Sequence, residues 1–305
     1  MIVLDDAAVR RLISPELAVE AVRQALAAQH AGLLAGPPRV RAPLNAGDLV
    51  FTAGRVSGVG YGFRVYDTLP TSGSDQLTVV FDDDGGQVLG AATGTWLGDA
   101  RTGAIGAVAV DLLADRAATG FAVVGTGAQA WSQLWAMRAV RTPRQVRVFS
   151  RDPGRRARFA ERCRAELGLP AQAAPDARAA VADADVVVLA TNSGTPVIVA
   201  EWVRPGAHVT TVGPKESGCH ECPVDLASRA ALLATDSLAQ LDAYPRPYFL
   251  TGTPDRQRMV SLAAVQAGQV VRPTGQETMT LFCSTGLAGT EVAVAAALFA
   301  RAELR

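Results

Sequence analysis

The chain has 305 residues, 49% of them apolar and 19% charged, which is enough apolar material for two domains of ordinary size. Lys plus Arg and Asp plus Glu number 29 each, and this balance argues against a nucleic-acid-binding protein. No apolar run approaches the roughly 20 residues of a membrane helix, and the acidic start at Asp5 and Asp6 is unlike a signal peptide. Four cysteines are too few for a disulfide framework, so we expect a cytoplasmic protein with reduced thiols.

The first part of the chain predicts a helix followed by an antiparallel sheet. Ser14 can cap the helix, Pro15 suits its first position, and Gly32 follows its last turn. Asp82–Gly86 has turn chemistry between two strand-like runs, which predicts a hairpin. A helix rich in Ala and Gly is expected at about 102–113. The strand-like runs are 48–53, 62–66, 77–81 and 87–91.

From Gly120 onward, apolar strands alternate with helices. This alternation predicts a parallel, doubly wound sheet. The last helix, at about 289–302, falls outside the alternation. The expected strands are 121–124, 145–149, 185–190, 208–212 and 231–235, and the expected helices between the first of them are 130–140 and 155–167.

The turn Gly125-Thr126-Gly127-Ala128-Gln129-Ala130 joins the first of these strands to its helix. In this position Gly125 permits a tight turn, Gly127 lets a pyrophosphate approach the backbone, and Ala130 keeps the helix close to the strand. The alternative is an ordinary turn with glycines for geometry alone. The context favours a site for a dinucleotide cofactor.

The end of the next strand distinguishes NADP(H) from NAD(H). An NAD site places an acidic residue there for the ribose diol, whereas here Phe149 is followed by Ser150, Arg151 and Asp152. A hydroxyl and a guanidinium suit a 2′-phosphate, and Asp152 is better placed to cap the following helix. The sequence therefore favours NADP(H) over NAD(H). The alternative is that Arg151 is solvated surface.

Several segments, in the same order along the chain, resemble the ornithine cyclodeaminase/mu-crystallin family of NAD(P)-dependent proteins. The resemblance covers most of the chain, but it does not specify the reaction, since members include cyclodeaminases, alanine dehydrogenases, ketimine reductases and a hormone-binding crystallin. The segments that carry it are 96–104, 124–130, 182–187, 201–208 and 284–288.

The resemblance implies an α/β fold in which a Rossmann-type doubly wound parallel sheet is inserted in a discontinuous α+β domain for substrate binding and dimerisation. We expect the substrate domain to comprise 1–114 and 285–305 and the NAD(P)-binding domain to comprise 115–284, with a homodimer as the assembly. The predicted cofactor-binding residues are Gly125, Thr126, Gly127, Ala128, Gln129, Ser150, Arg151, Thr191, Asn192, Ser193 and Gly213.

Members of the family bind a substrate carboxylate with arginines of the first domain, and the positions that match here are Arg39 and Arg101. Arginine stays charged and forms bidentate pairs with carboxylates, so both suit a small amino or imino acid. A structural salt bridge is the alternative for each. Arg64 stands where many members have lysine, so it can hold a carboxylate or polarise a group but is a poor general acid or base.

The second departure from the family is Lys215, the single lysine of the chain, which stands where cyclodeaminases have a catalytic aspartate. A positive charge there would repel the amine of ornithine. We expect Lys215 to bind a second carboxylate or to donate a proton to an imine, with an exposed loop lysine as the alternative. The predicted catalytic residues are therefore Arg64 and Lys215.

The leading hypothesis is an NADP(H)-dependent oxidoreductase that acts on the C–N bond of a small carboxylate substrate, by imine or ketimine reduction or by amino-acid dehydrogenation. The alternatives are an ornithine cyclodeaminase-type ammonia-lyase and a non-catalytic NADP(H)-dependent binding protein. Cys219 and Cys222 form a single Cys-x-x-Cys pair, which is incomplete for structural zinc, so no metal is expected.

Overall fold

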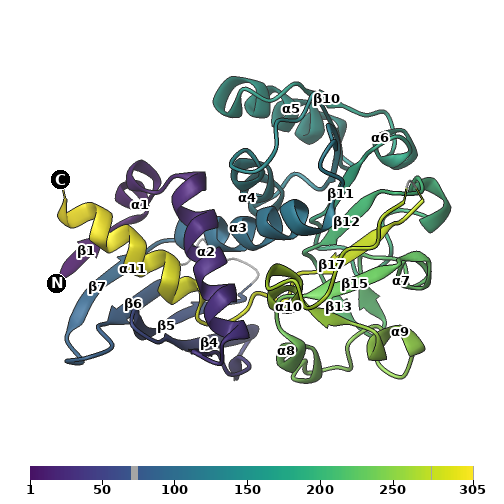
Figure 1. Cartoon of the computed structure of the whole chain (residues 1–305). Coiled ribbons are helices and arrows are strands. Elements are labelled where there is room, and N and C mark those ends of the chain that lie inside the picture. The colour runs from purple at the N-terminus through teal and green to yellow at the C-terminus, as the bar shows by residue number, and fades with distance from the viewer. Residues whose placement is uncertain (70–74, 276, 305) are drawn as a thin grey trace. The chain divides into compact units, whose positions relative to one another are not determined.

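The structure is a computed structural model that describes residues 1–69, 75–275 and 277–304. It divides into two compact units, Met1–Ile105 with Gly286–Arg305 and Gly106–Thr285 (Figure 1). The change of unit falls inside helix α3 (Trp96–Leu113), near residue 105 rather than at the expected residue 114. In the described part of the chain, no helix combines the length and apolar character that crossing a membrane requires.

The first unit contains a seven-stranded sheet in the order β1-β7-β6-β5-β4-β2, with β3 paired to β4. Strand β1 runs parallel to β7, and the other pairs are antiparallel. The predicted hairpin is confirmed, because the backbone amides of Asp84 and Gln87 donate to the Asp82 carboxylate between β6 and β7. The strands are β1 (Ile2–Leu4), β2 (Leu34–Ala35), β3 (Val40–Leu44), β4 (Gly47–Val56), β5 (Gly60–Asp67), β6 (Leu77–Phe81) and β7 (Val88–Thr93).

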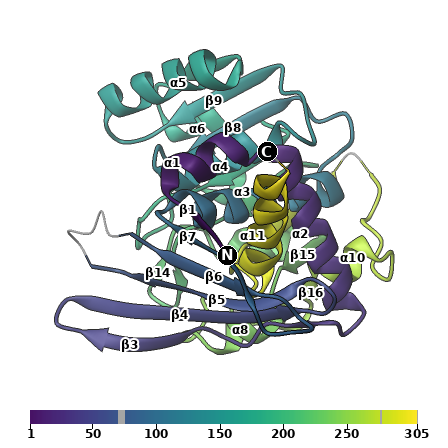
Figure 2. The same ribbon diagram turned by 90° about the vertical axis from the view of Figure 1, so that its left-hand side faces the viewer.

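In the described residues of this unit, three helices accompany the start of α3: α1 (Asp6–Leu12), α2 (Pro15–His30) and α11 (Thr290–Glu303). Helix α2 begins as predicted, with the Ser14 hydroxyl accepting from the Leu17 amide and Pro15 in the first turn. Figure 2 shows α2 and α11 side by side over the sheet, and α11 contacts β4 to β7. The last helix of the chain therefore packs on the first sheet.

The two faces of this sheet differ in what covers them. Thr52 is buried on the face toward α11, whereas its neighbour Phe51 is 38% exposed on the other. Phe51 stacks on Phe63, and Tyr61 stacks on Phe81, with 5.2 Å between ring centroids in each pair. In the first unit, the outer face is therefore apolar and partly exposed.

The second unit contains an eight-stranded sheet in the order β10-β9-β8-β11-β12-β17-β15-β16. Every pair in it is parallel, so the predicted doubly wound sheet is confirmed. Its strands are β8 (Gly120–Val124), β9 (Gln145–Phe149), β10 (Ala171–Ala173), β11 (Val186–Leu189), β12 (His208–Thr211), β15 (Leu232–Thr235), β16 (Val260–Ser261) and β17 (Thr280–Cys283).

Short helices and one hairpin complete the second unit. The hairpin pairs Lys215 with His220 and follows the end of β12. The helices are α4 (Ala128–Met137), α5 (Pro153–Leu167), α6 (Ala177–Val181), η1 (Ala200–Trp202), α7 (Asp225–Arg229), α8 (Leu238–Asp242), α9 (Pro254–Gln257) and α10 (Leu262–Gln266), and the hairpin strands are β13 (Lys215–Glu216) and β14 (Cys219–His220).

The strand order places a topological switch point at β8. The chain passes from β8 to β9 on one side and later returns to β11 on the other side. In open parallel sheets, the crevice at the carboxyl ends of strands beside such a reversal is where ligands bind.

Candidate active site

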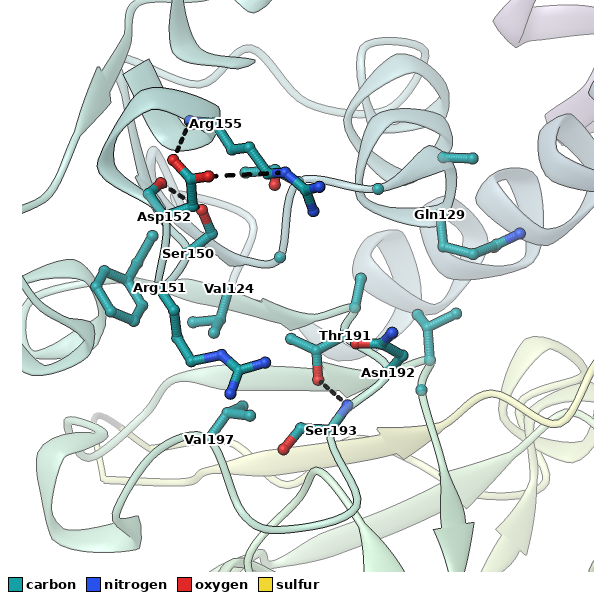
Figure 3. A pocket seen from close by; sticks show the side chains of 18 of the residues that line it. Val124, Gln129, Ser150, Arg151, Asp152, Arg155, Thr191, Asn192, Ser193 and Val197 are labelled. Atoms are coloured by element: carbon teal, nitrogen blue, oxygen red, sulfur yellow. Dashed lines mark hydrogen bonds and ion pairs between the residues drawn. The ribbon is translucent and has the colours of Figure 1, made fainter. Parts of the chain in front are cut away.

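A pocket of about 870 Å³ lies at this switch point, at the carboxyl ends of β8, β9, β11 and β12 (Figure 3). Each of the eleven residues assigned to the cofactor from sequence lines it. The remaining lining residues are Val124, Phe149, Asp152, Arg155, Ala190, Thr195, Pro196, Val197 and Val212.

The glycine turn at the carboxyl end of β8 has the geometry of a phosphate cradle. Gly125 has a φ of +122°, and a Cβ there would lie 2.1 Å from the Ala190 carbonyl oxygen. A Cβ on Gly127 would meet no atom within 4 Å, so this glycine borders open space. Gly127 is also the N-cap of α4 and makes no side-chain capping bond, which leaves the first amides of the helix for a ligand. The residues present therefore fit a dinucleotide pyrophosphate.

The segment after β9 supplies the polar groups on the opposite wall of the pocket. The Asp152 carboxylate accepts from the Arg155 amide at 2.9 Å and caps α5, as expected from the sequence. This backbone hydrogen bond lowers the pKa of Asp152. The exposed Arg151 side chain extends toward Ser193 and Val197 in Figure 3.

Arg155 also lines this pocket, and the sequence interpretation did not include it. Its ion pair with Asp152 is a loose one, at 3.8 Å. Its position in the first turn of the helix that follows Asp152 was the feature that could have identified it. The pocket therefore has two arginines near the place where an NAD site would present an acidic residue.

Glu221 is a second residue that was not assigned to the site. Its side chain is fully buried and accepts five hydrogen bonds. The donors belong to Thr191 at the end of β11 and to Thr211, Val212 and Gly213 at the end of β12. Its place in the sequence, between Cys219 and Cys222, gave no indication of this role.

Lys215 is 2% exposed, so the alternative of an exposed loop lysine is wrong. Its Nζ donates to the Gly213 carbonyl oxygen at 2.6 Å, and Gly213 lines the pocket. Burial lowers the pKa of Lys215, while the carboxyl groups of Glu221 and Asp236 and the titratable thiols of Cys283 and Cys222 act in the opposite direction. A lysine with a lowered pKa can give up a proton at a pH where an exposed lysine would hold it.

In the first unit, Arg39, Arg64 and Arg101 come together near the first turns of α3. Arg39 donates to the Gly286 carbonyl oxygen at 2.9 Å, and a Cβ on Gly286 would collide with the guanidinium groups of both Arg39 and Arg101. A Cβ on Gly98 would lie 2.6 Å from Nη2 of Arg64. The predicted substrate-binding arginines therefore form one cluster.

Most of this arginine cluster is buried. Arg101 is 2% exposed, and its Nε lies 3.9 Å from Oε2 of the buried Glu291. Arg101 therefore makes a long salt bridge, which was the structural alternative for this residue. Arg64 Nε donates to Gln76 at 2.8 Å, and its guanidinium lies 4.4 Å from the Tyr66 ring centroid. Burial and then the charge of Arg101 lower the pKa of Arg64 to about 10.

The acidic groups near these arginines compensate their charge in part. Burial raises the pKa of Asp99 to about 6, and Arg101 is the main group that lowers the pKa of Glu291 against its burial. Three guanidinium groups thus face two carboxyl groups, which leaves an electrostatic preference for a bound anion. Because Arg64 still holds its proton at neutral pH, it acts by charge and not by proton transfer.

The Cys219–Cys222 segment shows no metal-site geometry. His220 Nδ1 lies 2.8 Å from the Cys222 carbonyl oxygen, and Cys222 is buried. Among the residues that the structure describes, no three His, Cys, Asp or Glu side chains are grouped to hold a metal ion.

The profile of the ornithine cyclodeaminase/mu-crystallin family matches residues 1–304. The chain belongs to this family. A putative dehydrogenase of Rhizobium meliloti is 34% identical over 212 residues, which are 68% of this chain and 64% of that protein. The match thus spans less than two thirds of that relative. A Δ1-pyrroline-2-carboxylate reductase of Bacillus cereus is 31% identical over 237 residues, covering 74% of this chain and 70% of the relative.

Solved structures of family members share the fold. An archaeal alanine dehydrogenase dimer with bound NAD is 28% identical, with a TM-score of 0.90 over 100% of this chain and 96% of that one. The iminosuccinate reductase of Paracoccus denitrificans in complex with NAD⁺ is 27% identical, with a TM-score of 0.89 over 100% of this chain and 97% of that one. This chain and these two proteins therefore share one architecture over nearly their full lengths.

Proposed function

We propose that this protein is an NADP(H)-dependent oxidoreductase that reduces the C=N bond of a small imino acid or ketimine, or runs the same reaction in the direction of amino-acid dehydrogenation. The observation that carries the proposal is the pocket at the β8 switch point, where the glycine turn, Arg151, Arg155 and the Lys215–Gly213 contact come together. The names of the relatives, which are imine reductases and an alanine dehydrogenase, support the same bond type.

The choice of NADP(H) rests on charge. Arg151 and Arg155 supply two guanidinium groups for a 2′-phosphate, and the Ser150 hydroxyl lies beside them. The single carboxylate of this segment, Asp152, is engaged in capping α5 and so is not presented to a ribose diol. The solved relatives carry NAD, so a preference for NADP(H) would distinguish this chain from them.

The bound cofactor would supply or accept the hydride at the substrate carbon. The residues of the chain then have two tasks. Arg39, Arg64 and Arg101 would bind the substrate carboxylate, for which a cluster of guanidinium groups, two of them buried, is suited. Lys215 would donate the proton that the substrate nitrogen takes up as the C=N bond becomes a C–N bond, so that one hydride and one proton are added in balance.

The charge of Lys215 also separates this proposal from ornithine cyclodeamination. An ammonium group at this position repels the side-chain amine of ornithine, whereas a neutral or anionic substrate side chain is compatible with it. The test is to incubate the protein with NADPH and a cyclic imino acid, and separately with ornithine and NAD⁺, and to identify the products by mass spectrometry. The proposal requires the reduced amine in the first reaction, and proline with ammonia in the second would favour a lyase.

We further propose that the protein forms a homodimer through the outer face of the first sheet. Phe51, Phe63, Tyr61 and Phe81 form stacked aromatic pairs on a face that α2 and α11 do not cover. Contiguous exposed apolar surface of this kind marks an interaction site. The alanine dehydrogenase relative is a dimer, which supports a second copy of this chain as the partner.

A further inference from the structure

Glu221 connects two loops that line the cofactor pocket. Its Oε2 accepts from the amide and the hydroxyl of Thr191, each at 2.7 Å. Its Oε1 accepts from the Thr211 hydroxyl at 2.9 Å and from the amides of Val212 and Gly213 at 3.1 and 2.6 Å. The two oxygens therefore join the carboxyl end of β11 to that of β12.

The backbone of Glu221 adds to this connection. Its carbonyl oxygen accepts from the Val197 amide at 2.9 Å, and its amide donates to the Pro214 carbonyl oxygen at 3.2 Å. Val197, Thr191 and Gly213 all line the pocket, whereas Glu221 itself does not. Glu221 thus fixes the wall of the pocket from behind.

Backbone amides occupy both carboxylate oxygens of Glu221. Oε2 accepts from the amide of Thr191 and Oε1 from the amides of Val212 and Gly213, and a backbone amide can only donate. Whichever way a carboxamide of the same size turned, its NH₂ group would face at least one of these amides. Buried donors that lose their acceptor are costly, so the site distinguishes Glu from Gln strongly.

The same carboxylate acts on Lys215. Gly213 donates its amide to Glu221 and accepts from Lys215 Nζ with its carbonyl oxygen, so one residue connects the two side chains. The other charged or titratable groups that face Lys215 are Asp236 after β15, Cys283 at the end of β17 and Cys222 beside Glu221. Of these groups, Glu221 makes the largest contribution in favour of the protonated lysine.

We infer that Glu221 is a positioning residue with two effects: it holds the β11 and β12 loops in the shape that binds the cofactor, and it keeps the Lys215 ammonium group charged and directed at Gly213. The second effect rests on the proposed function, in which Lys215 is the proton donor. The first effect concerns cofactor binding alone and does not depend on the reaction.

The test compares wild type with Glu221→Gln by two readouts. The dissociation constant of NADPH, measured by fluorescence without substrate, is expected to rise about tenfold, because buried amides lose their acceptor. The alkaline limb of kcat/KM for imine reduction is expected to move about one pH unit lower, because a nearby opposite charge no longer favours the ammonium form. A variant with the dissociation constant and the limb of wild type would overturn the inference.

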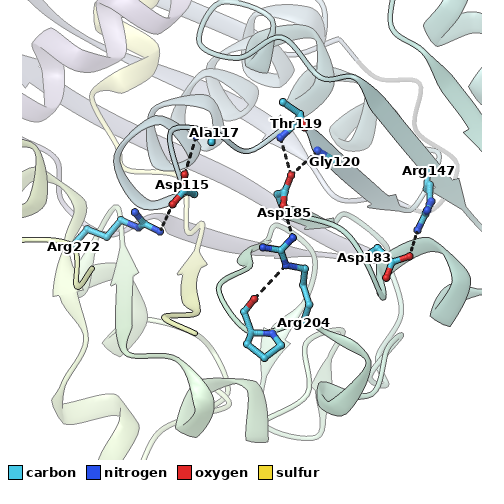
Figure 4. A network of polar contacts seen from close by, with 10 residues as sticks. Asp115, Ala117, Thr119, Gly120, Arg147, Asp183, Asp185, Arg204 and Arg272 are labelled. Atoms are coloured by element: carbon cyan, nitrogen blue, oxygen red, sulfur yellow. Dashed lines mark hydrogen bonds and ion pairs between the residues drawn. The ribbon is translucent and has the colours of Figure 1, made fainter. Parts of the chain in front are cut away.

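A matched control lies at the amino ends of the strands of the same sheet. Asp185 accepts from the amides of Thr119 and Gly120 at 2.8 and 2.7 Å and pairs with Arg204 (Figure 4). Like Glu221, Asp185 accepts hydrogen bonds from backbone amides, but it lies at the end of the strands away from the pocket. Asp185→Asn should therefore leave both readouts within about twofold of wild type. If the two variants had equal effects, Glu221 would contribute only to the general stability of the fold, which would contradict the inference.

A second variant keeps the inference testable if the glutamine variant does not fold. Glu221→Asp retains the charge but shortens the reach, so NADPH binding should weaken while the alkaline limb stays at its wild-type position. Unchanged NADPH binding in this variant would contradict the role in holding the loops. If replacing Lys215 itself left the alkaline limb of kcat/KM unchanged, the proposed role of Lys215 as proton donor would be wrong, and the role of Glu221 in holding the loops would not be affected.

Discussion

Lys215 Nζ donates a hydrogen bond of 2.6 Å to the carbonyl oxygen of Gly213, a residue of the pocket wall. The single lysine of the chain is thus buried and hydrogen-bonded to the wall of the pocket where the cofactor is proposed to bind. A buried ammonium group that is partly balanced by carboxylates is the arrangement that tunes lysine for proton transfer.

The proton-donor role predicts a pH dependence. Burial lowers the pKa of Lys215 from its usual 10.5, so the fraction that carries a proton falls as the pH rises through this lowered pKa. We expect kcat/KM for imine reduction to be high below that pKa and to fall above it. Lys215→Met should reduce kcat by about 10²- to 10⁴-fold and remove this limb, which a pH–rate profile measures. A Met variant that keeps the limb would show that another group titrates.

The cofactor preference predicts a selective effect at Arg151. Arg151→Ala removes a guanidinium from the proposed 2′-phosphate site, so the dissociation constant of NADPH should rise by about tenfold or more while that of NADH changes little. Arg158→Ala, on the exposed part of α5 outside the pocket lining, is the matched control and should change neither constant. Equal weakening of both cofactors in the Arg151 variant would argue against a 2′-phosphate contact.

The arginine cluster predicts a substrate-binding effect at Arg101. Lysine keeps the charge but lacks the planar fork, so Arg101→Lys should raise KM for the carboxylate substrate about tenfold and leave NADPH binding unchanged. Steady-state kinetics at saturating NADPH measures the change. Arg41→Lys, on β3 and paired with Asp48, is the control and should behave as wild type. If both variants kept the wild-type KM, the carboxylate would have to bind elsewhere.

The apolar face of the first sheet predicts the oligomeric state. Phe51→Glu places a charge among stacked aromatic rings, so light scattering after size-exclusion chromatography should show a monomer where wild type shows a dimer. Val271→Glu replaces an apolar residue that is 77% exposed in the second unit and should leave the dimer intact. A Phe51 variant that remains dimeric would place the interface on another surface.

Features set by neighbouring residues in the chain were predictable from the sequence. The Ser14 and Asp152 caps, the Asp82 hairpin and the Gly125–Gly127 turn each depend on a few consecutive residues, and the structure has them as expected. Strand β17 (Thr280–Cys283) was missed, although its four residues are as buried as those of β11, β12 and β15, which were predicted.

The predictions were incomplete where contacts are distant in sequence. Glu221 reaches Thr191 across 30 positions, and nothing in its own loop indicates that its carboxylate joins two strands. The groups that act on the pKa of Lys215 likewise include Asp236, which follows β15, and Cys283, at the end of β17. The helix expected at 102–113 begins earlier, at Trp96, because the Trp96 amide finds an acceptor in Asp6, which is 90 residues away.

NADPH-dependent imine reduction is tested most directly by measuring the oxidation of NADPH by the wild-type protein with preformed cyclic imino acids and with 2-keto acids plus an amine. We expect at least one of these substrates to oxidise NADPH and to yield the reduced amino acid in equal amount, with Lys215→Met and Arg101→Lys both slower. Tight NADPH binding without turnover of any of them would show instead a cofactor-dependent binding protein and would rule out the proposed reductase.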